Sequence, residues 1–191
     1  MGTSPVTRLT EADYLTLERI ASTKSEYVGG EMVARAGGSP RHAMLSSQVL
    51  LNLGSQLVGR GCFAVNSDLR IRSPHGEQFY PDVSVICGPV GTHAGIKDVC
   101  TNPVVLVEVL SPSTANYDRG LKFVLYREIP SLRDYLIFHC DAIHVEHYTR
   151  QPDDGWQLRN YTRVRLSGRD SGPIQRRTHT AQHLPYRRRR R

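Results

Sequence analysis

The sequence predicts an α/β or α+β domain built on a mixed β-sheet. Its 191 residues suit one domain with its own core and are too few for two. The periodic segments follow the order helix, hairpin, helix, strands, helix, strands, without internal repeats. Two almost wholly apolar runs, residues 80–88 and 104–113, are typical of strands buried on both faces. No apolar run reaches eighteen residues, so no membrane-spanning helix is expected.

Helices are expected where apolar residues recur every three to four positions. They cover residues 10–22, 39–61 and 117–131. Thr10 is a suitable N-cap for the first helix because Asp13 follows three residues later. Ser39 or Pro40 begins the second helix, and Pro130 stops the third.

Strands are expected where apolar and β-branched residues alternate or cluster between turn residues. Two short strands form a hairpin around Gly29–Gly30, and the other strands cover residues 62–73, 80–88, 104–113, 132–139, 142–150 and 156–164. Residues 90–103 are expected to form a loop. After Val164 the apolar periodicity ends, so a domain over residues 1–164 and a disordered tail over residues 165–191 are expected.

The net charge of +7 comes from the tail. Residues 159–191 hold eleven arginines and one acid, whereas residues 1–158 carry a net charge of −3. The body is therefore mildly acidic, and any general attraction to nucleic acid depends on the tail. Residues 187–191 are all arginine, so the tail is interpreted as either an arm that contacts phosphates or a solvated segment without a role.

The four cysteines are scattered without metal-binding spacing. Cys87 and Cys140 fall at strand-like positions and are expected to be buried thiols. The N-terminus lacks the pattern of a secretory signal. These features favour a reduced, cytoplasmic protein.

Each of the two buried strands carries one acid, Asp82 or Glu108, inside its apolar run. A buried carboxylate must be hydrogen-bonded, paired with a cation or bound to a metal, because otherwise its pKa rises and it stays neutral. Adjacent strands would bring the two acids side by side at one end of the sheet. Oxygen ligands of this kind suit Mg²⁺ or Mn²⁺, which would remove the repulsion between them.

The helix after Glu108 presents a polar stripe at positions i, i+4 and i+8: Asp118, Lys122 and Tyr126. Lys122 could reach the carboxylates and stabilise charge on a phosphate. The alternatives are that Asp82 caps a turn, that Glu108 pairs with an arginine such as Arg70 or Arg72, and that Asp118–Lys122 is a surface salt bridge. The spacing alone does not decide between them.

Five segments together resemble the Uma-two family of restriction-endonuclease-like proteins: SEYVGGEMV, GGSPRHAMLSSQVLLNL, YPDVSVI, VVLVEVLSPSTANYDRGLKFVLYRE and LRDYLIF. The resemblance runs from about Tyr14 to Tyr161 and places the chain in the PD-(D/E)XK nuclease superfamily. It implies a restriction-endonuclease-like fold, with a central mixed sheet flanked by helices and a divalent-metal phosphodiesterase site.

The resemblance assigns Pro81–Asp82 to the PD motif and Glu108 to its second acid. The usual lysine two residues later is replaced by Leu110, so Lys122 on the following helix is the expected substitute. Catalytic roles are thus expected for Asp82, Glu108 and Lys122, with Mg²⁺ or Mn²⁺ held by the two acids. The family's N-terminal motifs also point to three accessory residues: Glu26, Glu31 and His42.

The function that this pattern favours is a metal-dependent DNA endonuclease that hydrolyses phosphodiester bonds. A second reading is a catalytically inactive nucleic-acid-binding or assembly module with the same fold. A small-molecule hydrolase ranks last, because few aromatic or glycine-rich features mark a nucleotide pocket. DNA is the expected partner, no membrane partner is expected, and a homodimer is an open alternative.

Overall fold

The computed structural model describes residues 8–35, 37–93, 95–111, 114–162 and 176–180. The fold is a mixed α/β structure with two sheets, each containing one parallel strand pair. The larger sheet has the strand order β12 (Arg176–Thr180), β11 (Trp156–Thr162), β10 (His144–Arg150), β9 (Asp134–His139), β8 (Pro103–Leu110), β6 (Val83–Cys87) and β3 (Cys62–Asn66). The smaller sheet has the order β2 (Glu31–Ala34), β1 (Ser25–Val28), β5 (Gln78–Phe79), β4 (Arg70–Arg72) and β7 (Val99–Cys100).

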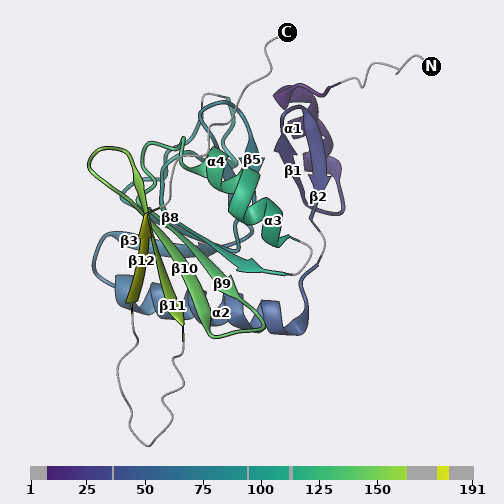
Figure 1. Cartoon of the computed structure of the whole chain (residues 1–191). Helices are drawn as coiled ribbons and strands as arrows, with labels where there is room; N and C mark the ends of the chain where they lie inside the picture. The colour runs from purple at the N-terminus through teal and green to yellow at the C-terminus, as the bar shows by residue number, and fades with distance from the viewer. Residues whose placement is uncertain (1–7, 36, 94, 112–113, 163–175, 181–191) are drawn as a thin grey trace, which may run out of the picture.

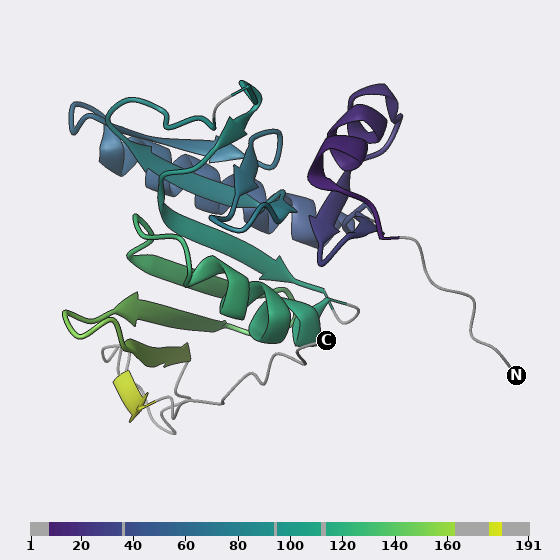
Figure 2. The same ribbon diagram turned by 90° about the horizontal axis from the view of Figure 1, so that it is seen from above.

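Helices cover both faces of the larger sheet (Figures 1 and 2). The long helix α2 (Pro40–Leu57) lies along one face. A continuous helical stretch lies along the other and consists of α3 (Ala115–Tyr117), the π-helical turn η1 (Asp118–Lys122) and α4 (Phe123–Tyr126). Helix α1 (Glu11–Ile20) lies beside the β1–β2 hairpin. Among the described residues, none of these helices has the length and apolarity needed to cross a membrane.

The helix starts follow the expected capping chemistry. Thr10 and Asp13 form a capping box at α1, in which each side chain bonds to the other residue's backbone N–H. The Ser39 hydroxyl accepts a hydrogen bond from the His42 backbone N–H at the start of α2. These contacts satisfy N–H groups that lack partners within the helix.

Strand β8 lies at the centre of the core because both of its faces are covered. Leu106 and Leu110 belong to the apolar cluster on the side of the α3–α4 stretch. Val107 points the other way and packs with Val83 and with Val49 of α2. This two-sided burial explains why the strand is almost wholly apolar, and it makes the single acid Glu108 costly unless its charge is compensated.

Two expectations about the chain between residues 62 and 103 were wrong. Residues 62–73 form two strands in different sheets, β3 and β4, with a turn between them. Arg70 and Arg72, on the second of these strands, are buried. The expected loop at 90–103 contains β7, which pairs with β4 over two residues. So short a strand shows no periodicity that could have revealed it.

The cysteine prediction also needs correction, because Cys62 and Cys87 form a disulfide. They face each other across the β3–β6 pair, and such a register cannot be read from sequence spacing. Cys140 is half-buried and Cys100 is the buried free thiol. The argument for a reduced compartment therefore loses the thiol at Cys87 that supported it.

The tail differs from the expectation of disorder over one segment. Arg176–Thr180 forms β12, which pairs antiparallel with β11. The larger sheet thus continues beyond Val164. The rest of the tail, including the arginines at 187–191, lies outside the described residues, so the interpretation as a phosphate-contacting arm stays a prediction.

Candidate metal and phosphodiester site

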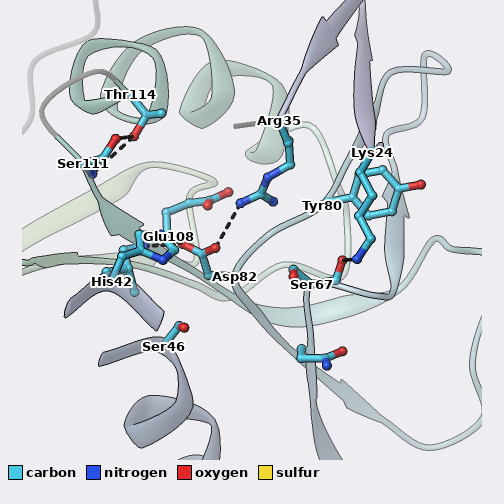
Figure 3. A network of polar contacts seen from close by, with 12 residues as sticks. Lys24, Arg35, His42, Ser46, Ser67, Tyr80, Asp82, Glu108, Ser111 and Thr114 are labelled. Atoms are coloured by element: carbon cyan, nitrogen blue, oxygen red, sulfur yellow. Dashed lines mark hydrogen bonds and ion pairs between the residues drawn. The ribbon is translucent and has the colours of Figure 1, made fainter. Parts of the chain in front are cut away.

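The two buried acids lie next to each other, Asp82 just before strand β6 and Glu108 within strand β8. Strands β6 and β8 are antiparallel, and their first pair is Val83 opposite Val107, so Asp82 comes just before β6 at the level of Glu108. Both acids are almost fully buried, at 7% and 2% exposure. Figure 3 shows their carboxylates pointing into the same space at the end of the sheet.

Lys122 reaches this pair from the helical stretch above the sheet. Its ammonium lies 2.8 Å from Glu108 Oε1 and 3.4 Å from Asp118 Oδ1, and it is itself buried. It lies in the π-helical turn, a wider turn that often occurs at functional sites. The Tyr126 hydroxyl donates a hydrogen bond of 2.8 Å to the same oxygen of Glu108. The polar stripe expected from the sequence thus faces the sheet.

Glu26 brings the smaller sheet into the site. It is buried on β1, and its Oε1 lies 3.0 Å from the Lys122 ammonium. The Tyr80 backbone N–H donates to the same oxygen, and the Tyr117 hydroxyl donates to the other. These contacts hold Glu26 beside Lys122.

Asp82 is surrounded by donors. Arg35 Nη2 lies 3.0 Å from its Oδ1, and His42 Nε2 lies 3.1 Å from its Oδ2. The backbone N–H of Val109 also donates to Oδ2, at 2.8 Å. Arg35 follows β2 and His42 lies in the first turn of α2, so the end of the sheet is approached from both sides (Figure 3).

The pKa values of the two acids are shifted in opposite directions. Burial raises the pKa of Glu108 to about 7; Lys122 opposes this rise and the charge on Asp82 adds to it. Burial would also raise the pKa of Asp82, but hydrogen bonds from His42 and Val109 and the charge of Arg35 hold it below its usual value.

The nearby cations are held in their charged forms. Burial alone would lower the pKa of Lys122, but Glu108, Glu26 and Asp118 outweigh it and raise the pKa well above its usual value. The hydrogen bond to Asp82 raises the pKa of His42. Lys122 therefore stays protonated, whereas burial raises the pKa of both Glu108 and Asp118.

The structure also decides between the alternatives that the sequence left open. Arg70 pairs with Asp98, and Arg72 pairs with Glu11, so neither neutralises Glu108. The Asp118–Lys122 pair is buried and is no surface salt bridge.

Of the three accessory residues, Glu26 and His42 contact the site and Glu31 does not. Glu31 is exposed on β2, and no hydrogen bond or ion pair within the described residues links its side chain to Asp82 or Glu108. Arg35 and Tyr117 are site residues that sequence reasoning missed. Arg35 follows β2 in a segment without apolar periodicity, so only the fold brings it to Asp82.

The mixed sheet with helices on both faces and the acid–lysine cluster at its end define a protein of the restriction-endonuclease-like class. The chain belongs to the Uma2 family, described as "Putative restriction endonuclease", whose profile matches residues 11–177. Two uncharacterized proteins of Synechocystis are similar to it. One is 36% identical over 83% of this chain and 83% of its own length, and the other is 37% identical over 78% and 85%. The crystal structure of a putative nuclease of the DUF820 group from Anabaena variabilis has the same fold, with a TM-score of 0.64, 18% identity and coverage of 78% of this chain and 83% of that one.

Proposed function

We propose that the protein is a divalent-metal-dependent DNA endonuclease of the PD-(D/E)XK type. Asp82 and Glu108 would hold Mg²⁺ or Mn²⁺, and Lys122 would act on the phosphate. The observation that carries this proposal is an imbalance of buried charge. Four buried acids meet at the end of the sheet: Glu26, Asp82, Glu108 and Asp118.

Only two permanently charged groups, Arg35 and Lys122, contact these four acids among the described residues. His42 adds at most one further positive charge. With all four acids ionised the buried site carries a net charge of −1 to −2, which is unfavourable. The charge is relieved when Glu108, whose pKa is about 7, keeps its proton, or when a cation binds. A divalent ion would bring the cluster close to neutrality, and the all-oxygen donor set suits Mg²⁺ or Mn²⁺. When bound, such an ion supplies Lewis-acid stabilisation of phosphate charge and activates water.

The chain's own residues have separate roles in this proposal. Lys122 is held by Glu26 and Glu108 and stays protonated, so it can stabilise negative charge that develops on the phosphate oxygens without reorganising. Arg35 Nη1 is a buried donor that lies 3.9 Å from Glu26 Oε1 and makes no hydrogen bond among the described residues. It is therefore suited to bind a phosphate oxygen beside Asp82. His42 positions Asp82 through its Nε2 contact.

One observation favours the second candidate, an inactive nucleic-acid-binding module. Arg35 Nη2 already bonds to Asp82 Oδ1, an oxygen that a metal would use. A guanidinium at this place competes with metal, and in a degenerate nuclease it could replace the metal altogether.

The deciding experiment measures cleavage of supercoiled, linear and single-stranded DNA with Mg²⁺, Mn²⁺ or EDTA. Cleavage that needs the metal and is lost in Asp82→Asn and Lys122→Met supports the nuclease. The matched control is Asp134→Asn, which removes an acid paired with His147 elsewhere on the sheet and should leave cleavage intact. Cleavage that survives Asp82→Asn would contradict the site assignment. DNA binding without cleavage under every condition would favour the inactive module.

A further inference from the structure

A second cluster of metal-type ligands lies at the β9–β10 hairpin. Strand β9 ends at His139 and β10 begins at His144. Val145 is opposite Phe138, so the next pair outward is His144 opposite His139. Glu146 follows two residues later and therefore points to the same face. Antiparallel pairing thus brings two imidazoles and one carboxylate together.

The side-chain atoms of this cluster are close enough to share one ion. One potential ligand atom from each of His139, His144 and Glu146 lies within 4.8 Å of the others. His139 Nε2 is 2.9 Å from Glu146 Oε1, and the two imidazole rings stack with centroids 4.1 Å apart. Glu146 is buried at 7% exposure, so its carboxylate needs a cationic partner.

Two further contacts orient the ligands from outside. His144 Nε2 lies 2.8 Å from Asn160 Oδ1, an acceptor. The tautomer that matches this acceptor has its proton on Nε2 and its lone pair on Nδ1, which is the nitrogen that would bind the metal. The Tyr148 hydroxyl donates to Glu146 Oε2 at 3.2 Å. Outer hydrogen bonds of this kind hold metal-binding side chains in position.

The Arg119 guanidinium supplies the positive charge beside Glu146, but it leaves the Nε2 atom of His139 with two contacts that ask for opposite hydrogen-bonding roles. Its guanidinium donates to Glu146 Oε1 from both Nε and Nη2. Its Nη2 also lies 2.9 Å from His139 Nε2, which is equally close to Glu146 Oε1. A neutral imidazole nitrogen can accept from Arg119 or donate to Glu146, and it cannot do both. A metal ion between the nitrogen and the oxygen would satisfy both as ligands.

We propose that His139, His144 and Glu146 form a Zn²⁺-type site, and that in the metal-free protein the Arg119 guanidinium occupies the place of the metal. A donor set of two imidazoles and a carboxylate suits Zn²⁺ and leaves a fourth position for water, whereas Mg²⁺ prefers oxygen alone. The Arg119 side chain is 35% exposed, so it can turn into solvent when the metal binds.

This site is separate from the nuclease site and does not depend on the proposed function. In the sheet, Glu108 of β8 is opposite Ile137 of β9, and Ile137 is opposite Glu146 of β10. The two acids are therefore two strands apart, about 10 Å at the usual strand spacing. That distance exceeds the roughly 4 Å between the ions of a shared two-metal centre. Zn²⁺ at the hairpin would bind independently of an ion at Asp82.

The test is titration of the full chain with Zn²⁺ alone by calorimetry, and with Co²⁺ followed by its visible absorption. All titrations use a background variant with two substitutions. Asp82→Asn removes a ligand of the proposed nuclease site, and Cys140→Ser removes the thiol next to His139, so neither group can bind the added metal. We expect one Zn²⁺ per chain and the intense spectrum of four-coordinate Co²⁺. His144→Ala and Glu146→Gln should weaken binding at least tenfold, and Asn160→Ala should weaken it about tenfold.

Arg119→Gln provides the sharpest outcome because it keeps every ligand and removes the competing cation. It should tighten Zn²⁺ binding about tenfold, an effect that a purely structural role for the cluster does not produce. His147→Ala is the matched control: this histidine lies on the same strand, bonds to Asp134 and points to the other face, so affinity should not change. Absence of stoichiometric binding in Arg119→Gln would overturn the proposal, as would binding that survives loss of both His139 and His144.

Discussion

Replacing Glu108 with glutamine should stabilise the metal-free protein at alkaline pH. Glutamine has nearly the shape of a protonated glutamate and carries no charge. In the folded protein burial raises the pKa of Glu108 from 4.5 to about 7. Between these two values the unfolded chain has lost a proton that the folded protein still holds, so stability falls as pH rises through this window. Glutamine does not titrate, so the variant does not lose this stability as pH rises.

The size of the effect follows from the pKa difference. One pKa unit corresponds to about 1.4 kcal/mol, and integration over the window gives a penalty of roughly 0.8 kcal/mol at pH 5 and roughly 3.3 kcal/mol at pH 8. Glu108→Gln should therefore gain about 2.5 kcal/mol relative to the wild type between pH 5 and pH 8. For a chain of this length that is a rise in relative Tm of about 5–10 °C.

Thermal unfolding in EDTA from pH 5 to pH 8 measures this difference. The control is Glu146→Gln, which removes a buried acid whose pKa is shifted in the opposite direction. Burial would raise the pKa of Glu146, but its hydrogen bonds with Arg119 and His139 hold the pKa below the usual value. Its contribution to stability is present above the unfolded pKa and is lost as pH falls, so this variant should be destabilised at neutral pH. A Glu108→Gln difference that is independent of pH, or that falls with rising pH, would refute the charge argument.

Three further predictions concern the same network and the disulfide. Lys122→Met should lower the free energy of unfolding by about 3–5 kcal/mol in EDTA, because it leaves buried carboxylates without their cation. Millimolar Mg²⁺ should restore part of this loss. Denaturant unfolding measures the change, and the control Lys24→Met, which breaks an exposed ion pair, should lower the free energy by at most about 1 kcal/mol. The double variant Cys62→Ser, Cys87→Ser should lose about 3.5 kcal/mol, the value for a loop of this length, and reductant should lower the Tm of the wild type alone. Arg35→Met should tighten Mg²⁺ binding about tenfold in calorimetry by freeing a carboxylate oxygen, and unchanged affinity would show that the guanidinium does not compete with metal.

Local chemistry made much of the fold predictable. The capping box at Thr10 and Asp13, the N-cap at Ser39 and the glycine pair of the hairpin each depend on neighbouring residues, and the structure has all three. The three expected helices are present, although the third contains a π-helical turn. The division of residues 62–73 between two sheets could not be predicted, because it depends on which distant strands pair with each half.

Sequence also selected most of the site. An acid inside an apolar strand is costly, so the apolar pattern alone singles out Asp82 and Glu108. The i, i+4 spacing pointed to Lys122, and the family resemblance pointed to Glu26 and His42. The fold brings all five to the same end of the sheet, where the ion pairs and hydrogen bonds described above connect them. Their catalytic and metal-binding roles stay predictions.

What the sequence alone determined is therefore what depends on local spacing and burial cost: the helix starts, the two buried strands and the acids within them. Only the tertiary structure decided how distant segments meet. It brought Arg35 to Asp82, joined Cys62 to Cys87 and placed His139 opposite His144. The physical reason is strand register. A shift of one residue turns every side chain to the other face, and register is set by the packing of the whole sheet.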